Sequence, residues 1–241
     1  YNHLQPNIVN EQFRGFMTTY GVLSPYRIPK PVYYWYQSEL VNKPIVHIAD
    51  ETASKDGKIR VFSNCQEVEL YHNNILIARQ LPDNDITKTN LNHPSFTFRY
   101  NWESGTLKAI GYSNDIKITE FTRHKQGKPH HIKVEYNIDD KPFYAGGSDI
   151  RLVYAYILDK NGEVVTSSKN KVQFAISGVG KIIDNGKIYS NPATVYNGVA
   201  AIYIKGTDQT GSITVTAKAK GLKPGKASIN TVKFNTNEIV N

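Results

Sequence analysis

Hydrophobic residues recur at two different periods along this chain, and the change falls near residue 58. Before that point, four apolar residues follow one another at helical spacing, directly after a proline, which the first turn of a helix tolerates. They are Val32, Trp35, Tyr36 and Leu40. The pattern predicts an amphipathic helix of about two to three turns. After residue 58 the period is two, which is typical of half-buried strands.

Residues 42–123 carry the alternation and the turn signals of one small β-sandwich. Residues 67–80 predict a hairpin, because Asn73-Asn74 between two alternating runs suits the positive φ angles of a tight turn. An aromatic face is predicted where aromatic and polar residues alternate, at Phe96, Phe98, Tyr100 and Trp102. Two more strands are predicted at 107–111 and 117–122.

A polar, basic stretch at 123–129 suits a linker better than a strand. We therefore expect a second domain at 124–236, followed by a polar tail at 237–241. Its strands are predicted at 132–138, 150–158, 172–176, 199–204 and 212–219. Strands at this spacing, separated by Gly and Asn, indicate an immunoglobulin-like sandwich, although the Cys-Trp-Cys framework of antibody domains is absent.

The composition of the 241 residues agrees with this interpretation. Sixteen Tyr, 17 Gly and 11 Pro, against one Met and two Trp, favour strands and turns over long helices. The predicted fold class is therefore all-β, with two immunoglobulin-like β-sandwich domains in tandem. A short helical N-terminal segment, residues 1–41, precedes them.

Charge and cysteine content exclude several classes of partner. The formal net charge is +8, but the lysines are spread singly along strands and turns, so we expect a solvated basic surface and no nucleic-acid partner. The single cysteine, Cys65, permits neither an internal disulfide nor a thiolate zinc site. No apolar run reaches the roughly 18 residues of a spanning helix, so no membrane partner is expected.

The titratable residues offer no catalytic, metal or cofactor site. The adjacent pairs Asp139-Asp140 and His130-His131 would point to opposite faces of a strand, so neither pair can act on one substrate or metal ion. Gly178-Val179-Gly180 lacks the βαβ context of a dinucleotide loop and predicts a turn. We expect no cofactor.

Aromatic side chains suggest one binding chemistry, the stacking of sugar rings on exposed faces. The weak candidates for carbohydrate binding are Trp35, Tyr36 and Trp102. The alternative is that Trp35 and Tyr36 pack against a neighbouring layer and that Trp102 lies in the core. The residues alone thus indicate binding or spacer modules without a visible active site.

Three sets of motifs follow one another in a recognisable order. The first is Phe13-Arg14-Gly15-Phe16 with Arg27-Ile28-Pro29-Lys30-Pro31 and the paired Tyr33-Tyr34. The second is Val61 to Tyr71 with Gly105 to Tyr112. The third is Asp184-Asn185-Gly186, Tyr196 to Ala200 and Gly211 to Ala217. Together they resemble the C-terminal end of glycoside hydrolase family 2, the β-galactosidase-like group. Asn73-Asn74 stands where that family usually has Asn-Gly.

The resemblance implies the fold and role of each part. Residues 1–41 would be a remnant of the catalytic (β/α)₈ barrel end, 42–123 the first accessory sandwich, and 124–236 the terminal immunoglobulin-like domain. The family cleaves β-glycosides with retention by two glutamates on barrel strands. Glu11, Glu39 and Glu51 match no catalytic motif, so we assign no catalytic residue and expect the catalytic machinery upstream of Tyr1.

The expected function is that of non-catalytic accessory domains, which brace the barrel and can shape the substrate cleft or an oligomer interface. The expected partners are the catalytic barrel of the same parent chain, carbohydrate and a second copy of the chain. The expected location is periplasmic or secreted, in a bacterium. Two alternatives stay open: a carbohydrate-binding module that uses exposed aromatics, and an adhesin-like array.

Overall fold

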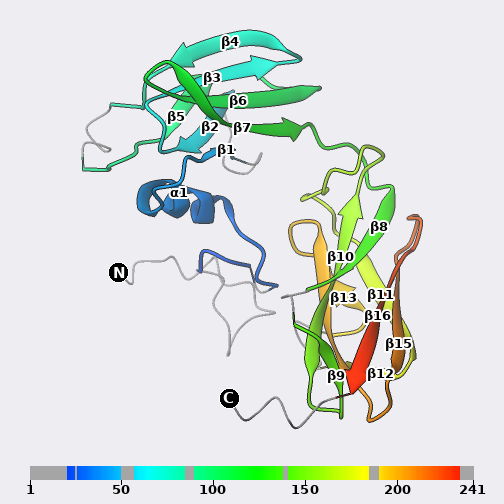
Figure 1. Cartoon of the computed structure of the whole chain (residues 1–241). Helices are drawn as coiled ribbons and strands as arrows, with labels where there is room; N and C mark the ends of the chain where they lie inside the picture. Colours follow the sequence, from blue (N-terminus) through cyan, green and yellow to red (C-terminus); the bar gives the residue numbers. More distant parts are fainter. Residues whose placement is uncertain are drawn as a thin grey trace, which may run out of the picture. The chain divides into compact units, whose positions relative to one another are not determined.

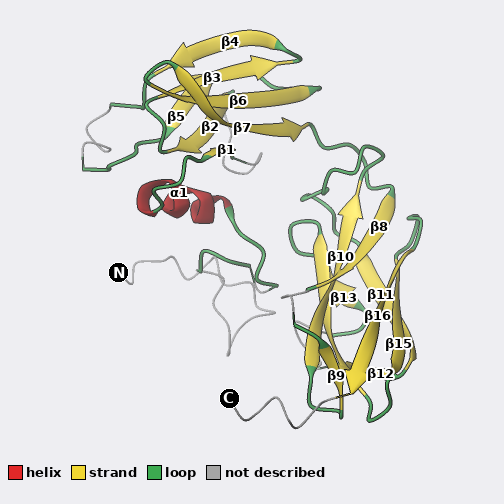
Figure 2. Ribbon diagram, viewed as in Figure 1, coloured by secondary structure: helices red, strands yellow, loops and turns green. Residues whose placement is uncertain are grey.

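The structure is a computed structural model that describes residues 21–24, 26–49, 57–84, 90–137, 141–184 and 190–233. These residues form one α-helix and sixteen β-strands (Figures 1 and 2). They divide into two compact units, the first ending at Lys125 and the second beginning at Gln126. The predicted all-β class with a single short helix is confirmed.

The first unit contains the helix α1 (Pro31–Leu40) and two antiparallel sheets. One sheet has the order β1-β2-β5, with β1 (Val46–Ile48), β2 (Lys58–Ser63) and β5 (Phe96–Arg99). The other has the order β4-β3-β6-β7, with β3 (Glu67–His72), β4 (Ile75–Gln80), β6 (Thr106–Ser113) and β7 (Ile116–His124). The core combines side chains of both sheets: Val61 and Phe96 from one, Val68 and Leu107 from the other.

The predicted hairpin at 67–80 is found as β3 and β4. Asn73 and Asn74 occupy its turn with φ angles of 48° and 68°, the left-handed region that asparagine tolerates better than most residues. The predicted aromatic strand is shorter than its pattern, because β5 ends at Arg99. Tyr100 and Trp102 follow the strand and are half-buried against the same core.

The second unit is a two-sheet sandwich of nine strands within the described residues. One sheet has the order β12-β14-β10-β8, with β8 (His131–Tyr136), β10 (Ile150–Leu158), β12 (Gly180–Ile183) and β14 (Val199–Gly206). The other has the order β13-β11-β15-β16-β9, with β9 (Phe143–Ala145), β11 (Lys171–Gly178), β13 (Ala193–Thr194), β15 (Gly211–Lys218) and β16 (Gly225–Lys233). Its pairs are antiparallel except β16 with β9.

One side chain joins the two sheets of the second unit. The hydroxyl of Tyr136, on β8, points at the carbonyl oxygens of Ile213 and Ala227, on β15 and β16, at 3.0 and 3.1 Å. Tyr136 is buried, and burial raises the pKa of its phenol to about 12. The hydroxyl therefore stays a donor at neutral pH and ties the first sheet to the second.

The linker prediction at 123–129 needs a correction at its N-terminal end, whereas residues 125–129 contain no strand or helix. Arg123 and His124 belong to β7, where they pair with Leu107 and Thr106 of β6. Beyond them, the Gly127 amide donates to the Asp159 carboxylate at 2.8 Å, within the second unit. Backbone pairing with β6 therefore extends β7 into the start of this polar stretch, and the Asp159 carboxylate holds the loop that follows.

Several sequence predictions lie outside the described residues. They concern the barrel-end segment before residue 21, the glutamates Glu11 and Glu51, the pair Asp139-Asp140, Asn185-Gly186, and the tail 237–241.

Candidate functional site

One side of α1 is fixed to the first sandwich. The ring of Tyr34 stacks on the imidazole of His47, with centroids 3.5 Å apart and planes 7° apart. The Glu39 carboxylate accepts hydrogen bonds from the backbone amides of Asn92 (3.1 Å) and His93 (2.9 Å). Ser38, which precedes Glu39 in the helix, is fully buried. Ring stacking and charge-assisted hydrogen bonds therefore set the position of the helix.

His47 lies in an apolar and cationic environment. Its ring also contacts Phe121, at 4.5 Å between centroids, and Arg123 lies nearby and donates from Nε to the Ile48 carbonyl at 3.1 Å. Burial, and after it the charge of Arg123, lower the pKa of His47 to about 3. The imidazole is therefore neutral at physiological pH.

The opposite side of α1 is apolar and exposed. Val32, Tyr36 and Leu40 are 40%, 45% and 78% exposed, at positions four residues apart. Tyr36 is therefore only partly covered in the described structure. Trp35 is half-buried, meets the Tyr36 ring edge-on at 4.8 Å, and lines a hollow of about 410 Å³ with Phe62 and Ser95. We call Val32, Tyr36 and Leu40 the exposed helix face.

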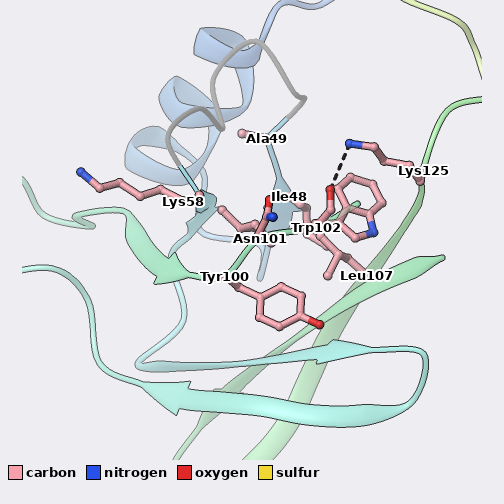
Figure 3. Close-up of a pocket in the computed structure, with 10 residues that line it drawn as sticks. Ile48, Ala49, Lys58, Tyr100, Asn101, Trp102, Leu107 and Lys125 are labelled. Carbon is pink, nitrogen blue, oxygen red and sulfur yellow. Dashed lines mark hydrogen bonds between the residues drawn. The ribbon is translucent and has the colours of Figure 1, made fainter. Parts of the chain in front are cut away.

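Trp102 lies at a second hollow, of about 250 Å³, shown in Figure 3. Residues Ile48, Lys58, Asn101 and Leu107 contribute to its wall. The Lys125 ammonium lies 4.9 Å from the centroid of the Trp102 ring and donates to the Trp102 carbonyl at 3.1 Å, the dashed line in Figure 3. The indole Nε1 is buried and has no acceptor among the described residues. The proposed sugar-binding roles of Trp35, Tyr36 and Trp102 stay predictions.

A polar cluster that the sequence analysis missed lies on the sheet β4-β3-β6-β7. Glu69 is only 9% exposed, and its Oε2 accepts hydrogen bonds from the hydroxyls of Tyr71 and Tyr112, both at 2.7 Å. The guanidinium carbon of Arg79 lies 4.7 Å from the centroid of the Tyr112 ring. Arg79 also pairs with Glu67 and Asp115. We call Glu69, Tyr71, Tyr112 and Arg79 the tyrosine cluster.

The tyrosine cluster fixes its own protonation states. Burial acts to raise the pKa of Glu69, but the two tyrosine hydroxyls and the charge of Arg79 lower it below its usual value. The hydrogen bond to Glu69, with burial, raises the pKa of Tyr112 to about 12. The cluster therefore holds one carboxylate and two protonated phenols at neutral pH. The alternation of residues 67, 69 and 71 could have indicated that Glu69 and Tyr71 share one face of a strand. It could not have indicated Tyr112, which comes from another strand.

Two further carboxylates, those of Asp159 and Asp149, hold loops of the second unit. Asp159 accepts hydrogen bonds from the backbone amides of Gly127, Asn161 and Glu163, and these bonds lower its pKa against the opposing effect of burial. Asp149 accepts the Tyr144 amide at 2.8 Å. Among the described residues there is no group of three or more His, Cys, Asp and Glu side chains that could hold a metal ion. No described helix is long and apolar enough to cross a membrane.

Two family matches cover parts of the two units. Residues 134–228 match glycoside hydrolase family 2 C-terminal domain 5. Residues 55–119 match a domain of unknown function, DUF4982.

Relatives align with nearly the whole chain. A beta-galactosidase of Thermoanaerobacter pseudethanolicus is 32% identical over 219 residues, which cover 83% of this chain and 28% of that protein. A beta-glucuronidase of Formosa agariphila is 26% identical over 231 residues, covering 90% of this chain and 22% of that protein. The solved structure of a beta-glucuronidase from glycoside hydrolase family 2 superposes with a TM-score of 0.75 at 26% identity, over 90% of this chain and 23% of that one.

The chain thus spans only 22–28% of the length of these relatives. Its match at residues 134–228 is to a domain described as a C-terminal domain of glycoside hydrolase family 2. The carboxylates of Glu39, Asp149 and Asp159 accept hydrogen bonds from backbone amides, which fits an accessory role. The chain belongs to glycoside hydrolase family 2 and corresponds to an accessory C-terminal β-sandwich region of that family.

Proposed function

We propose that this chain braces the catalytic barrel of a longer family 2 hydrolase and that the exposed helix face is the surface that packs on the barrel. The barrel would cleave a β-glycoside with retention, in a periplasmic or secreted bacterial enzyme. The two sandwiches would stiffen it, and can form a wall of the substrate cleft or an interface between copies of the enzyme.

The observation that carries the proposal is that α1 is anchored on one side and apolar and exposed on the other. One side is fixed by Tyr34 and Glu39, so the position of the helix on the first sandwich does not depend on any further partner. The other side presents Val32, Tyr36 and Leu40 to solvent. Contiguous apolar surface of this kind marks an interaction site more often than an ordinary monomer surface.

The barrel is the occupant that the relatives favour. In each of them, about three quarters of the protein lies outside the part that this chain matches. The motif Arg27 to Tyr34, which leads into α1, resembles the closing part of the family's barrel. A helix that continues directly from the barrel would bury its free face there without a long connection.

The test compares the full-length enzyme with the isolated chain. The double variant Tyr36→Glu, Leu40→Lys places charges on the exposed helix face, and Ile150→Lys, on an exposed residue of the second unit, is the matched control. The double variant should lower the melting temperature and kcat/KM of the full-length enzyme, while it leaves the melting of the isolated chain unchanged. Full-length enzyme that melts and turns over like wild type would reject the brace.

A further inference from the structure

We propose that the outer face of the sheet β4-β3-β6-β7 binds a neutral oligosaccharide on the tyrosine cluster. This site is separate from the exposed helix face, and the binding of a sugar there would be a function in addition to bracing the barrel. The rings of Tyr71 and Tyr112 would pack against the C–H faces of two neighbouring sugar units.

The two rings are held in place before any ligand arrives. Their hydroxyls converge on one oxygen of Glu69, each at 2.7 Å, so the rings reach the carboxylate from two different strands, β3 and β6. Arg79 fixes the Tyr112 ring further, and the Lys108 ammonium lies 5.4 Å from the Tyr71 centroid. Ordered side chains lose little conformational entropy on binding, which favours affinity for a flexible chain of sugars.

Acceptors and donors for sugar hydroxyls surround the Tyr112 ring. A hollow of about 540 Å³ opens beside it and is lined by Gln66, Glu67, Leu81, Tyr112, Asn114 and Asp115. Carboxylate and amide oxygens accept hydrogen bonds from hydroxyl groups, and amide nitrogens donate them. The volume lies in the range of small-molecule sites. An aromatic ring beside convergent polar groups suits a ligand with one apolar and many polar edges.

The charges at this face select a neutral ligand over an acidic one. Four carboxylates, of Glu67, Glu69, Asp115 and Glu120, stand against the cations Arg79, Lys108 and Lys117. Arg79 and Lys117 already pair with carboxylates of this set. A uronate would meet no uncommitted excess of positive charge here, whereas a neutral sugar has no such cost.

The second unit offers a matched pair of tyrosines for comparison. Tyr154 and Tyr156 lie on β10, with centroids 5.9 Å apart and planes tilted by 46°. They are two positions apart on one strand, as Glu69 and Tyr71 are. Tyr156→Ala is therefore the control for the loss of one half-buried tyrosine ring outside the proposed site.

The experiment titrates the full chain, labelled with ¹⁵N, with β-1,4-linked galactotetraose, cellotetraose and tetragalacturonate. A neutral tetrasaccharide should shift amide signals of β3 and β6 near Tyr71 and Tyr112 in a saturable way. Tyr112→Ala should weaken its binding about tenfold, as expected for loss of a central aromatic contact. Leu81→Arg, which blocks the hollow without touching Glu69, should also weaken it, and Tyr156→Ala should not.

Four outcomes would overturn the proposal. The first two are the absence of any shift with either neutral probe at about 10 mM, and shifts that map elsewhere, such as to the hollow at Trp102. The third is an affinity of the Leu81→Arg variant equal to that of the unaltered chain. The fourth is tighter binding of tetragalacturonate than of the neutral probes. The map on the unaltered chain and Leu81→Arg decide the matter even if Tyr112→Ala does not fold.

Discussion

The ring of Tyr34, on α1, lies parallel to the imidazole of His47, on β1, with 3.5 Å between their centroids. This contact makes the helix part of the first unit. It also places a titratable group where it is buried and next to Arg123. The stability of the first unit should therefore depend on pH through His47.

We predict that the first unit loses stability as the pH falls below about 6.5. The pKa of His47 is about 3 in the folded chain, against an ordinary value of 6.5, so the unfolded state binds more protons between these two values. Between pH 7.5 and pH 5.5 the free energy of unfolding should fall by about 1.4 kcal/mol. Urea unfolding at both pH values measures it.

His47→Phe is the control for this prediction, because phenylalanine keeps the ring contacts with Tyr34 and Phe121 but does not titrate. The pH dependence above pH 5.5 should largely disappear in this variant. Glu69 and Asp159, whose pKa values are lowered, lose their contributions only as the pH falls through the acidic range below their ordinary values. An unchanged slope in His47→Phe would assign the effect to another group.

Gly111 and Cys65 should show a strong energetic coupling. A Cβ atom at Gly111 would clash with the Cys65 sulfur and come within 3.0 Å of Thr119 Cγ2. Gly111→Ala should destabilise the first unit by about 1–3 kcal/mol, as overpacking does. In a Cys65→Ala background the cost should fall to less than half, measured by a double-mutant cycle. Additive effects of the two changes would show that the clash is relieved elsewhere.

Tyr136→Phe should destabilise the second unit by about 1 kcal/mol, because it removes the hydroxyl that joins the two sheets and leaves the carbonyls of Ile213 and Ala227 without that donor. Thermal unfolding measures the loss. Tyr156→Phe, on a half-buried ring of the same unit, is the comparison and should cost less. An equal loss of stability in Tyr136→Phe and Tyr156→Phe would show that the Tyr136 hydroxyl does not stabilise the sandwich by joining its two sheets.

The two units should unfold in separate transitions. Each has its own buried cluster, one around Phe96 and Leu107 and the other around Val153 and Ile202. Calorimetry should resolve two heat-absorption peaks, with Gly111→Ala lowering one and Tyr136→Phe lowering the other. A single cooperative peak that both variants lower would mean that the units stabilise each other.

Local patterns were sufficient to predict the helix and many of the strands. The alternation at Phe96 and Phe98 and the turn at Asn73-Asn74 are properties of a few neighbouring residues. Strand β16 was missed although Lys226, Ser228 and Asn230 alternate with inward residues. Those inward residues, such as Ala227 and Ile229, are small or only partly buried, so the apolar signal of the alternation is weak. The strand β9 pairs with β16 in parallel. The periodicity of a local sequence cannot show such a partner, because the two strands are far apart along the chain.

The candidate sites depended more on long-range contacts. The aromatic residues chosen from sequence were those in dense local runs, such as Trp35 and Tyr36. The tyrosine cluster instead joins Glu69 to Tyr112, 43 positions away, through the pairing of β3 with β6. Only the register of that pairing brings the two phenols to one carboxylate.

We expect that this region of a glycoside hydrolase does not itself catalyse hydrolysis. Retaining hydrolysis needs two carboxyl groups about 5–5.5 Å apart on either side of the scissile bond. The most direct measurement is the turnover of 4-nitrophenyl β-galactoside and β-glucuronide by the purified 241-residue chain. We expect no nitrophenol release above the buffer blank. Release that scales with the concentration of the chain would contradict it.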